Sequence, residues 1–452
     1  MVMVLGLGRS GMSVVRSLTA GGAHIIAWDD NEETRARAQE RGVEIVDPQQ
    51  VEWSRIAAMV PSPGISISNP GIHPIVSAAR TANVPILGDI ELFARTGQVA
   101  SIVGITGTNG KSTTTALIGH ILEQVGRSVR VGGNFGTPVL DLEPVGSDGV
   151  FVLELSSFQL ELTESLCCDI ASLLNLSPDH LDRHGSMSSY VAAKKRIFSA
   201  NCHSQIAVVG IDDKYSRSVF DELMESHHSS LVPISAKRPC EGIYVLGNVL
   251  HEHLHGESFQ TNLDITKGLP GSHNMQNAAA AYAAARVLGI CASSIVQSLN
   301  SYGGLPHRLQ EFAQIRNVRF VNDSKATNAS AASRALECFE NVFWIAGGRL
   351  KQDDIESVWP YLENVRHVFL IGEAADKFSQ ALSGRVPYTL SGDLQHAVVA
   401  AFEMAQTEVA SAVVLLAPAC SSYDQWSNFE ERGEAFQNCV EKLSIAVGPA
   451  AI

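Results

Sequence analysis

Short apolar runs alternate with amphipathic stretches along most of the chain. Near the start, the apolar run Val2–Leu5 is followed by a helical pattern over Gly11–Thr19 and a second apolar run, Ala23–Trp28. Another short strand is expected at residues 85–87. Strands that alternate with helices favour a doubly wound α/β sheet. We therefore predict a small domain of this kind over residues 1–95.

The middle of the chain continues this pattern and adds an antiparallel element. Apolar runs at 102–105, 149–155 and 170–175 indicate buried strands. Residues 244–259 alternate between apolar and polar side chains around a Gly-Asn turn, which is typical of a β-hairpin. We predict a central domain with a mainly parallel sheet over residues 96–304.

A Gly-Gly-Leu-Pro linker at residues 303–306 precedes a third alternating segment. The strands expected there are 319–322, 342–346, 367–371 and 412–417, and the helices are 329–338, 394–405 and 431–443. This alternation predicts a Rossmann-like C-terminal domain over residues 305–452. The whole chain is therefore expected to be an α/β protein of three domains.

Length and composition agree with three domains and exclude some partners. The 452 residues are too many for one core, and 45% hydrophobic with 18% charged residues are ordinary for a soluble enzyme. The net charge of −14 argues against binding to nucleic acids or anionic membranes. No apolar run reaches the roughly 18 residues of a membrane helix, and the chain begins at once with a strand, so no signal peptide is visible. The eight cysteines include no C-x-x-C pair, which predicts reduced thiols in a cytoplasmic protein.

A glycine-bearing turn between a buried strand and a helix predicts a phosphate-binding site. In such loops, backbone N–H groups surround a triphosphate, a lysine neutralises its β and γ oxygens, and a hydroxyl ligates Mg²⁺. Ile105 stands where the strict phosphate-loop pattern has its first glycine, so the loop is a variant. The residues expected to hold ATP are Gly107, Thr108, Asn109, Gly110, Lys111, Ser112 and Thr113.

The first strand leads into a second glycine motif. The run GLGRSG, residues 6–11, opens a helix directly after that strand. Asp29 and Asp30 end the next strand, where dinucleotide-binding folds place a ribose-binding acid. The motif alone suggests NAD, but the same geometry also holds another diphosphate, such as a UDP group. The first domain is therefore expected to be Rossmann-like. The motif alone does not decide whether it binds NAD or a UDP group.

Polar residues follow several other strands. Glu154 ends a strand beside the phosphate loop, where an acid commonly ligates Mg²⁺. Residues 175–184 offer an imidazole and two carboxylates, which suit a second metal or an anion clamp but also a solvated charged turn. Residues 322–328 and 417–426 end strands of the third segment with hydroxyls and acids. Because strand ends form the ligand crevice of open α/β sheets, these loops predict one composite site.

The ordered motifs resemble the Mur ligase family over nearly the whole chain. They are GLGRSG, SPG, GITGTNGKST, GGNFG, LELSSFQLE, SPDHLDRH, YVAAKKRI, HNMQN, LPHR, NDSKATN, PACSSYDQW and NFEERG. GTNGKST is shared with folylpolyglutamate synthases, whereas LELSSFQLE, NDSKATN and PACSSYDQ are similar to the family member that adds D-glutamate. The resemblance implies an ATP-dependent ligase that joins D-glutamate to UDP-N-acetylmuramoyl-L-alanine through an acyl phosphate, in cytoplasmic peptidoglycan precursor synthesis. It also implies ATP and two Mg²⁺ ions as cofactors, small-molecule partners only, and a monomer.

The resemblance further implies a role for each matching residue. The catalytic residues would be Lys111, His180, Lys194 and Arg308, with Lys194 carbamylated by CO₂ into an anionic metal ligand. The metal ligands would be Ser112, Glu154, His180 and Lys194. Nucleotide contacts beyond the loop would come from Asn274, Asn277, Arg308 and Asp323. The sugar nucleotide and D-glutamate would be bound by Arg9, Ser10, Asp29, Asp30, Gly64, Asn134, Ser156, Gln159, Lys325, Thr327, Lys351, Ser422 and Phe429.

Three rival functions remain open on the sequence. An NAD-dependent oxidoreductase would explain the first glycine motif but leaves the phosphate loop and the third domain unexplained. Another amino-acid ligase of the same family, such as a folylpolyglutamate synthase, would share the phosphate loop but not the N-terminal nucleotide domain. An ATP-binding switch or scaffold would have no use for the polar strand-end loops of the third segment.

Overall fold

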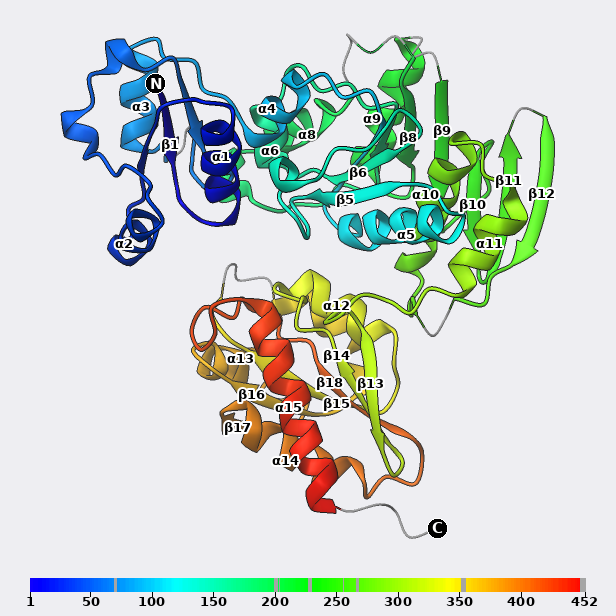
Figure 1. Cartoon of the computed structure of the whole chain (residues 1–452). Coiled ribbons are helices and arrows are strands. Elements are labelled where there is room, and N and C mark those ends of the chain that lie inside the picture. The colour runs from blue at the N-terminus through cyan, green and yellow to red at the C-terminus, as the bar shows by residue number, and fades with distance from the viewer. Residues whose placement is uncertain are drawn as a thin grey trace. The chain divides into compact units, whose positions relative to one another are not determined.

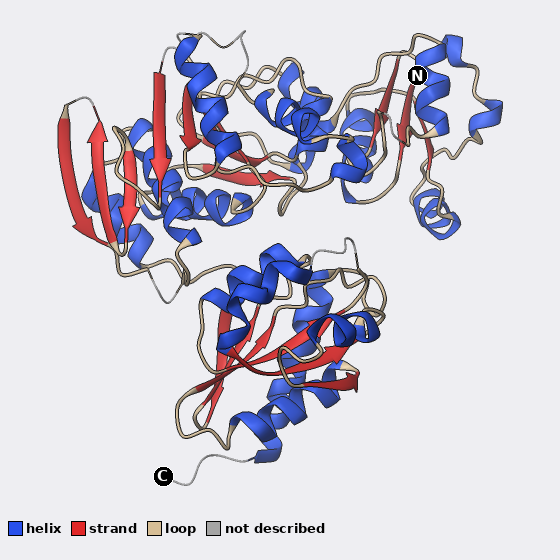
Figure 2. Ribbon diagram, turned by 180° about the vertical axis from the view of Figure 1, so that it is seen from behind, coloured by secondary structure: helices blue, strands red, loops and turns tan. Residues whose placement is uncertain are grey.

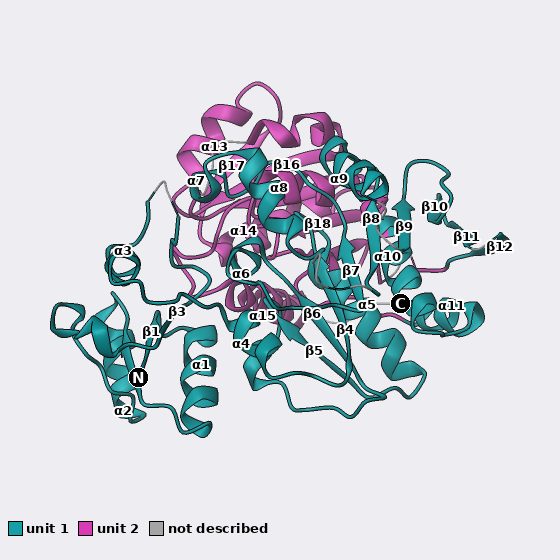
Figure 3. Cartoon of the chain, turned by 90° about the horizontal axis from the view of Figure 1, so that it is seen from above, with its two compact units in different colours: residues 1–263, 275–301 teal, residues 264–274, 302–452 magenta. Residues whose placement is uncertain are grey.

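The computed structural model describes residues 1–68, 71–198, 202, 204–226, 230–254, 256–265, 268–350 and 355–447. Contacts between residues divide the chain into two units (Figure 3). One unit combines Met1–Leu263 with Met275–Ser301, and the other combines Asp264–Asn274 with Tyr302–Ile452. The backbone therefore passes between the units at 263–264, at 274–275 and at 301–302.

A three-stranded parallel sheet begins the first unit (Figure 1). Its strands are, in spatial order, β2 (Ile25–Trp28), β1 (Val2–Leu5) and β3 (Ala58–Pro61). The helices of this part are α1 (Arg9–Ala20), α2 (Glu32–Glu40), the 3₁₀ turns η1 (Pro48–Gln50) and η2 (Trp53–Arg55), α3 (Pro74–Thr81) and α4 (Asp89–Arg95). The strand predicted at 85–87 is wrong. Only Ile86 pairs, as a single bridge to Met59, because Pro85 has no N–H to extend a ladder.

A nine-stranded sheet follows in the same unit, in the order β12-β11-β10-β9-β8-β7-β4-β6-β5. The strands are β4 (Ser101–Thr106), β5 (Val129–Gly133), β6 (Val150–Glu154), β7 (Ile170–Leu173), β8 (Ile206–Gly210), β9 (Ser230–Ser235), β10 (Ile243–Leu246), β11 (Val249–Leu254) and β12 (Glu257–Asn262). The helices are α5 (Lys111–Gln124), η3 (Val139–Asp141), α6 (Ser157–Glu161), α7 (Leu181–His184), α8 (Met187–Lys195), α9 (Lys214–Glu225), α10 (His273–Val287) and α11 (Ala292–Asn300). β10, β11 and β12 pair antiparallel, which confirms the predicted hairpin, and the other pairs are parallel.

The second unit contains a six-stranded sheet in the order β13-β14-β18-β15-β16-β17. The strands are β13 (Gln310–Ile315), β14 (Val318–Asn322), β15 (Val342–Gly347), β16 (Val365–Ile371), β17 (Tyr388–Gly392) and β18 (Ala412–Leu416). The helices are α12 (Ala329–Glu337), η4 (Ile355–Asn364), α13 (Ala375–Leu382), α14 (Leu394–Ala405) and α15 (Phe429–Val447). Among the strand pairs described in this sheet, β13–β14 is antiparallel and the other four are parallel. The expected α/β fold with mainly parallel sheets is confirmed.

Helices cover both faces of the six-stranded sheet (Figure 2). Trp344 and its neighbour Phe343 in β15 point to opposite faces, as successive strand residues do, and both are buried. Trp344 packs among residues of α12, η4 and α13, and Phe343 packs among residues of α14 and α15. The strand ends that carry polar loops therefore stand on a sheet buried on both sides.

The sequence predicted reduced cysteines and no membrane span. The first prediction is wrong for Cys167 and Cys202, which form a disulfide with their Cα atoms 5.5 Å apart. Their spacing of 35 residues gave no sign of this, because only the tertiary fold brings them together. Among the helices that the structure describes, none is both long and apolar enough to cross a membrane.

Candidate active site

The turn between β4 and α5 has the backbone of a phosphate-binding loop. Gly107 and Gly110 have φ angles of 151° and 84°, which L side chains rarely adopt. The Lys111 ammonium donates to the carbonyl oxygens of Gly107 and Thr108 at 3.0 and 2.9 Å. The turn therefore combines a curved glycine backbone with a cation folded against it, as anion-binding loops do.

Two amide side chains outside the implied site residues, Asn175 and Gln276, hold this turn in place. The Asn109 N–H donates to Asn175 Oδ1 at 2.9 Å, and Asn175 Nδ2 donates to Gln276 Oε1 at 2.9 Å. Gln276 Nε2 then donates to the carboxylate of Asp212 at 3.0 Å. The position of Asn175, directly after β7, was the one sequence signal that could have identified this chain of hydrogen bonds.

Replacing Gly110 by alanine is expected to destabilise the loop. The new Cβ would collide with Oδ1 of Asn277, and the φ of 84° would be strained for any L side chain. We expect a loss of about 2 kcal/mol or more in the free energy of unfolding, measured by urea denaturation. Gly126→Ala is the matched control, because Gly126 has a φ of 74° with no atom within 4 Å of the new Cβ. An equal loss in both variants would contradict the collision with Asn277.

Ser112, Glu154 and Asn134 meet beside the loop. Glu154 ends β6 and is only 3% exposed. Its Oε2 accepts a hydrogen bond from the Ser112 hydroxyl, and its Oε1 accepts one from Asn134 Nδ2 at 2.7 Å. In the described ranges, no group of three or more His, Cys, Asp or Glu side chains is arranged to hold a metal ion. A hydroxyl and a carboxylate nevertheless fit Mg²⁺, which usually takes its other ligands from water and substrate phosphates.

Lys194, on α8, is buried against the same loop. Its side chain is 2% exposed, and its ammonium donates to the Gly107 carbonyl oxygen at 2.8 Å and to Thr106 Oγ1 at 3.4 Å. The nitrogen also lies 4.9 Å from the ring centroid of Tyr190. Burial and the nearby charge of Lys111 lower the pKa of Lys194 well below its ordinary value. A neutral amine at this place would be a nucleophile.

His180 lies between β7 and α7, in a left-handed backbone conformation with φ of 53°. Its ring centroid is 4.9 Å from that of Phe158, and its Nε2 is 3.6 Å from the carboxylate of Asp179. Phe158 also stacks on His184, with the centroids 5.4 Å apart. Positive φ at a residue other than glycine is uncommon and concentrates at functional sites.

A cavity of about 380 Å³ lies at the GLGRSG turn. Asp29 holds this turn, because its Oδ2 accepts from the Leu7 N–H at 2.7 Å. The structure brings several of the substrate residues implied by the sequence to this one cavity, namely Arg9, Ser10, Asp29, Gly64 and Asn134. Asp30 instead pairs with His73 Nε2 at 2.9 Å, and this partner lowers the pKa of Asp30.

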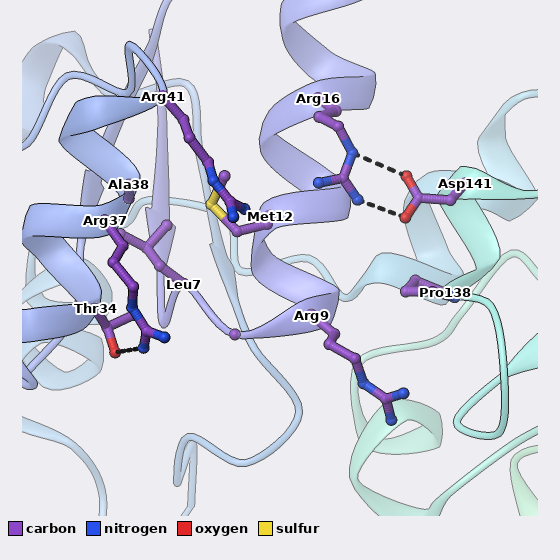
Figure 4. Close-up of a pocket in the computed structure, with 11 residues that line it drawn as sticks. Leu7, Arg9, Met12, Arg16, Thr34, Arg37, Ala38, Arg41, Pro138 and Asp141 are labelled. Carbon is purple, nitrogen blue, oxygen red and sulfur yellow. Dashed lines mark hydrogen bonds and ion pairs between the residues drawn. The ribbon is translucent and has the colours of Figure 1, made fainter. Parts of the chain in front are cut away.

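A second cavity, of about 390 Å³, lies between α1 and α2 (Figure 4). Arg9 and Arg16 extend from α1, and Arg37 and Arg41 extend from α2 and its end. Arg16 forms an ion pair with Asp141 at 2.6 Å. Arg9 lines both cavities. These arginines make the surface locally positive in a chain with a net charge of −14, which favours the approach of an anionic ligand.

Ser156 and Gln159 form the start of α6. The Ser156 side chain accepts from the Gln159 N–H, and the Gln159 side chain accepts from the Ser156 N–H, which is a capping box. Gln159 is 2% exposed. Ser156 and Gln159, which the resemblance implies as substrate residues, are therefore bonded to one another. Ser156 lies two residues after Glu154 in the chain.

The nucleotide residues implied by the sequence are divided between the two units. Asn277 belongs to the first unit, and Asn274, Arg308 and Asp323 belong to the second. Asp323 is buried after β14, and its Oδ1 accepts from the Leu309 N–H at 3.2 Å. Burial raises the pKa of Asp323 to about 7, although this hydrogen bond and the charge of Arg308 oppose the rise.

Two of the residues implied to bind D-glutamate touch each other. The Lys325 ammonium lies 3.9 Å from the ring centroid of Phe429, within the range of a cation–π contact. Thr327 is close in the chain, and its N–H donates to the Lys325 carbonyl oxygen at 2.8 Å. Lys351 lies outside the described residues.

A buried arginine joins the loops after β14 and β18. Arg432 is fully buried and donates to the carbonyl oxygens of Ser324 at 2.8 Å and Cys420 at 3.1 Å. Ser422, which is 2% exposed, follows in the second of these loops. The sequence assigned Arg432 no role, and its place in NFEERG was the only signal.

Three family models match the chain in succession. They are the Mur ligase MurD-like N-terminal domain at residues 1–88, the Mur ligase middle domain at 105–285, and the Mur ligase glutamate ligase domain at 307–420. The chain belongs to the Mur ligase family. This membership confirms the resemblance found in the motifs.

Relatives of this Mur ligase match it from end to end. A UDP-N-acetylmuramoylalanine--D-glutamate ligase of Caulobacter vibrioides is 47% identical over 460 residues, which cover 100% of this chain and 98% of the relative. A protein of the same name from Phenylobacterium zucineum is 46% identical over 459 residues, with the same coverage.

Solved structures share the fold of this Mur ligase. The UDP-N-acetylmuramate-alanine ligase MurC of Thermotoga maritima matches with a TM-score of 0.60 and 19% identity, over 98% of this chain and 99% of that one. The MurF ligase of Thermotoga maritima, solved with ADP, has a TM-score of 0.57 and 18% identity, over 88% of this chain and 98% of that one. At these identities the likeness concerns the fold alone.

Asp323 is expected to make this Mur ligase less stable as the pH rises. Its pKa of about 7 in the fold lies above the ordinary 3.8, so the protonated form is favoured in the folded chain. Its contribution to stability is therefore present below pH ~4 and is lost as the pH rises to ~7. Asp323→Asn should reduce the drop in the free energy of unfolding between pH 5 and pH 8 by about 1–3 kcal/mol.

Urea denaturation followed by tryptophan fluorescence checks this expectation, because Trp344 is buried in the six-stranded sheet. The exposed Asp376 on α13 supplies the control variant Asp376→Asn. A pH dependence unchanged by Asp323→Asn would refute the role given to the Asp323 carboxyl group.

Proposed function

We propose that this Mur ligase joins D-glutamate to UDP-N-acetylmuramoyl-L-alanine at the expense of ATP. The observation that carries the proposal is the 46–47% identity, over the full length, to relatives named for this reaction. Residues 1–95 would bind the sugar nucleotide, 96–304 the ATP, and 305–452 the amino acid. The enzyme would act as a monomer in the cytoplasm, where peptidoglycan precursors would be made.

The phosphate loop would hold ATP. The loop backbone would surround the phosphates, and the Lys111 ammonium already lies against that backbone, 2.9–3.0 Å from two of its carbonyl oxygens. Asn274, Asn277, Arg308 and Asp323 would complete the nucleotide site. Ser112, Glu154, His180 and carbamylated Lys194 would hold two Mg²⁺ ions, which neutralise phosphate charge when bound.

The sugar nucleotide would occupy the cavity at the GLGRSG turn. Arg9, Ser10, Asp29, Asp30 and Gly64 would meet its UDP end, and Ser156 and Gln159 its opposite end. Asn134 supports this arrangement, because it lines the cavity and also donates to Glu154 at 2.7 Å. The end of the substrate opposite the UDP group would then lie near the phosphate loop.

The reaction needs activation of a carboxylate, which is a poor electrophile at neutral pH. A carboxylate oxygen of the sugar nucleotide would attack the γ-phosphorus of ATP, and the bond to ADP would break to give an acyl phosphate. The amine nitrogen of D-glutamate would then attack the acyl carbon, phosphate would leave, and the amine would release its proton. Lys111 and Arg308 would screen the converging anions in both steps. No protein nucleophile is required.

D-glutamate would be bound in the second unit by Lys325, Thr327, Lys351, Ser422 and Phe429. Its two carboxylates require cationic partners, and the contact between Lys325 and Phe429 supports a cation held in a fixed place. Arg432 fixes the two loops that carry Lys325 and Ser422.

A phosphate-release assay tests the proposal directly. The chain, ATP and Mg²⁺ are mixed with UDP-N-acetylmuramoyl-L-alanine and each member of a panel of D- and L-amino acids. We expect phosphate and ADP only when both the sugar nucleotide and D-glutamate are present. Full-rate hydrolysis without either substrate, or equal use of another amino acid, would contradict the proposal.

A further inference from the structure

The short helix α4 carries two buried carboxylates, of which one bonds to α6 and the other to the turn after α6. Asp89 and Glu91 are 4% and 1% exposed. Gly88 packs so closely on the end of α6 that an added Cβ would lie 3.0 Å from Leu162 Cβ. Gly88 and α4, which precede the phosphate loop in the chain, therefore pack closely against the end of α6.

Gln159 is held at both ends of its side-chain amide. Its Nε2 donates to Asp89 Oδ2 at 3.0 Å and Oδ1 at 3.3 Å. Its Oε1 accepts from the Ser156 N–H at 3.2 Å and from the Ser156 hydroxyl at 3.1 Å. Because all of these groups are buried or partly buried, the orientation of the amide depends on Asp89.

We propose that Asp89 is a positioning residue for the sugar-nucleotide site, because it sets the amide of Gln159 and thereby the backbone and hydroxyl of Ser156. The inference rests on the proposed function, in which Ser156 meets the end of the sugar nucleotide that reacts. Asp89 itself touches no reacting group. Its effect is transmitted through two hydrogen-bonded side chains.

Among the described residues, the groups bonded to the Asp89 carboxylate are donors. The Ile90 N–H donates to Oδ1 at 2.9 Å, the NH₂ of Gln159 donates to Oδ2 at 3.0 Å, and the backbone N–H of Asp89 itself is a further donor. Only a group with two acceptor oxygens satisfies these donors, and an ionised carboxylate is such a group. Burial raises the pKa of Asp89, while the hydrogen bonds from Gln159 and Ile90 oppose that rise.

An asparagine at position 89 cannot satisfy the same partners. If its NH₂ faces Gln159, two donors meet, and if its NH₂ faces the Ile90 N–H, two donors meet there. Rotation of the Gln159 amide would remove the first conflict but would turn its NH₂ toward the Ser156 N–H. Each arrangement leaves a buried donor without an acceptor, at the place where the capping box begins α6.

A reciprocal exchange restores all of these bonds. In the double variant Asp89→Asn/Gln159→Glu, the asparagine NH₂ donates to the new carboxylate and its oxygen accepts from the Ile90 N–H. The second carboxylate oxygen accepts from the Ser156 N–H and hydroxyl. The number of buried carboxylates is the same as in the wild type. A difference between the single and double variants therefore reports on the pairing of donors with acceptors and not on the buried charge.

Glu91 supplies a control on the same helix. Its Oε2 accepts from the N–H groups of Glu164 and Ser165 at 2.7 and 2.8 Å, in the turn after α6. Burial alone would raise the pKa of Glu91, but these hydrogen bonds outweigh it and lower the pKa to about 2. Glu91→Gln therefore weakens the packing of α4 without reversing the Gln159 amide.

Steady-state kinetics of the full-length chain tests the proposal, with each of the three substrates varied in turn. Asp89→Asn should raise the KM for UDP-N-acetylmuramoyl-L-alanine about tenfold. A loss of this size is expected when about one buried donor is left without an acceptor. The KM values for ATP and D-glutamate should stay within about twofold of wild type. The double variant should have a sugar-nucleotide KM at least about threefold below that of Asp89→Asn, and Glu91→Gln should lower Tm without this KM change.

Equal increases in all three KM values, or no recovery in the double variant, would overturn the proposal. The same sugar-nucleotide KM change in Glu91→Gln would also overturn it, because general loosening of α4 would then explain the effect. If Asp89→Asn does not fold, the test passes to Gln159→Glu, whose sugar-nucleotide KM should fall by about threefold or more when Asp89→Asn is added. Wild-type chain without D-glutamate-dependent phosphate release would refute the proposed function, whereas an active wild type with an unaffected Asp89→Asn refutes only this inference.

Discussion

Lys111→Ala is expected to abolish ATP-dependent ligation, with kcat/KM falling by at least about 10³-fold. In the structure the ammonium lies against the carbonyl oxygens of Gly107 and Thr108, at the turn that would surround the phosphates. Its charge would be needed most when the γ-phosphoryl group passes between two anions. Alanine removes this charge from a partly buried place where water substitutes poorly for it.

ADP formation in a coupled assay, with both other substrates saturating, measures the loss. Lys195→Ala is the matched control, because Lys195 is also a lysine near the loop-bearing sheet but pairs with Glu222 at the surface. The control should keep its activity within about twofold. Normal turnover by Lys111→Ala would refute the assignment of the phosphate loop.

Lys194→Ala is expected to lose ligation by about 10²-fold or more, since one anionic metal ligand would be removed. Carbamylation requires a neutral amine that attacks CO₂. Burial, and then the charge of Lys111, lower the pKa of Lys194 and so favour that form. Its ammonium in the structure donates to Gly107 at 2.8 Å, which puts the modified group within reach of the loop.

High bicarbonate should not restore Lys194→Ala, because no amine remains to be carbamylated, whereas a short carboxylic acid such as acetate should restore part of the activity. ¹³C NMR of the wild-type chain in labelled bicarbonate should show a carbamate signal that is missing from Lys194→Ala and present in Lys195→Ala. Full activity of Lys194→Ala, or a carbamate signal that survives in it, would rule out the carbamate at this position.

The sequence predicted those parts of the fold that depend on local patterns. The helix α14, at Leu394–Ala405, has the predicted ends, because its apolar stripe and the Asp393 cap lie within a few residues. The edge strands β13 and β17 were not predicted. β17 leaves most of its side chains exposed, so it lacks the apolar run that marks a buried strand.

The same limit applies to the site. The parallel pairing of β4 with β6 places Glu154 beside the phosphate loop. The sequence predicted this proximity, because the carboxyl ends of parallel strands form the ligand site of open α/β sheets. Asp89 and Gln159 are 70 residues apart, and no local pattern connects them. The pairing of Asp30 with His73 and the Asn175–Gln276 bond likewise arise only from tertiary packing. The implied substrate contacts of the second unit stay predictions.

The segment Asp264–Asn274 has a consequence for how such enzymes diversify. It belongs to the second unit, where Ser272 Oγ donates to Glu337 at 3.2 Å, yet it is inserted between two pieces of the first unit. Neither unit is therefore a continuous gene segment. One recombination breakpoint cannot exchange the second unit intact between relatives, and a fragment that begins at Tyr302 omits part of its packing. An exchange that keeps the packing of the second unit would therefore have to carry the segment 264–274 along with the residues from 302 onward.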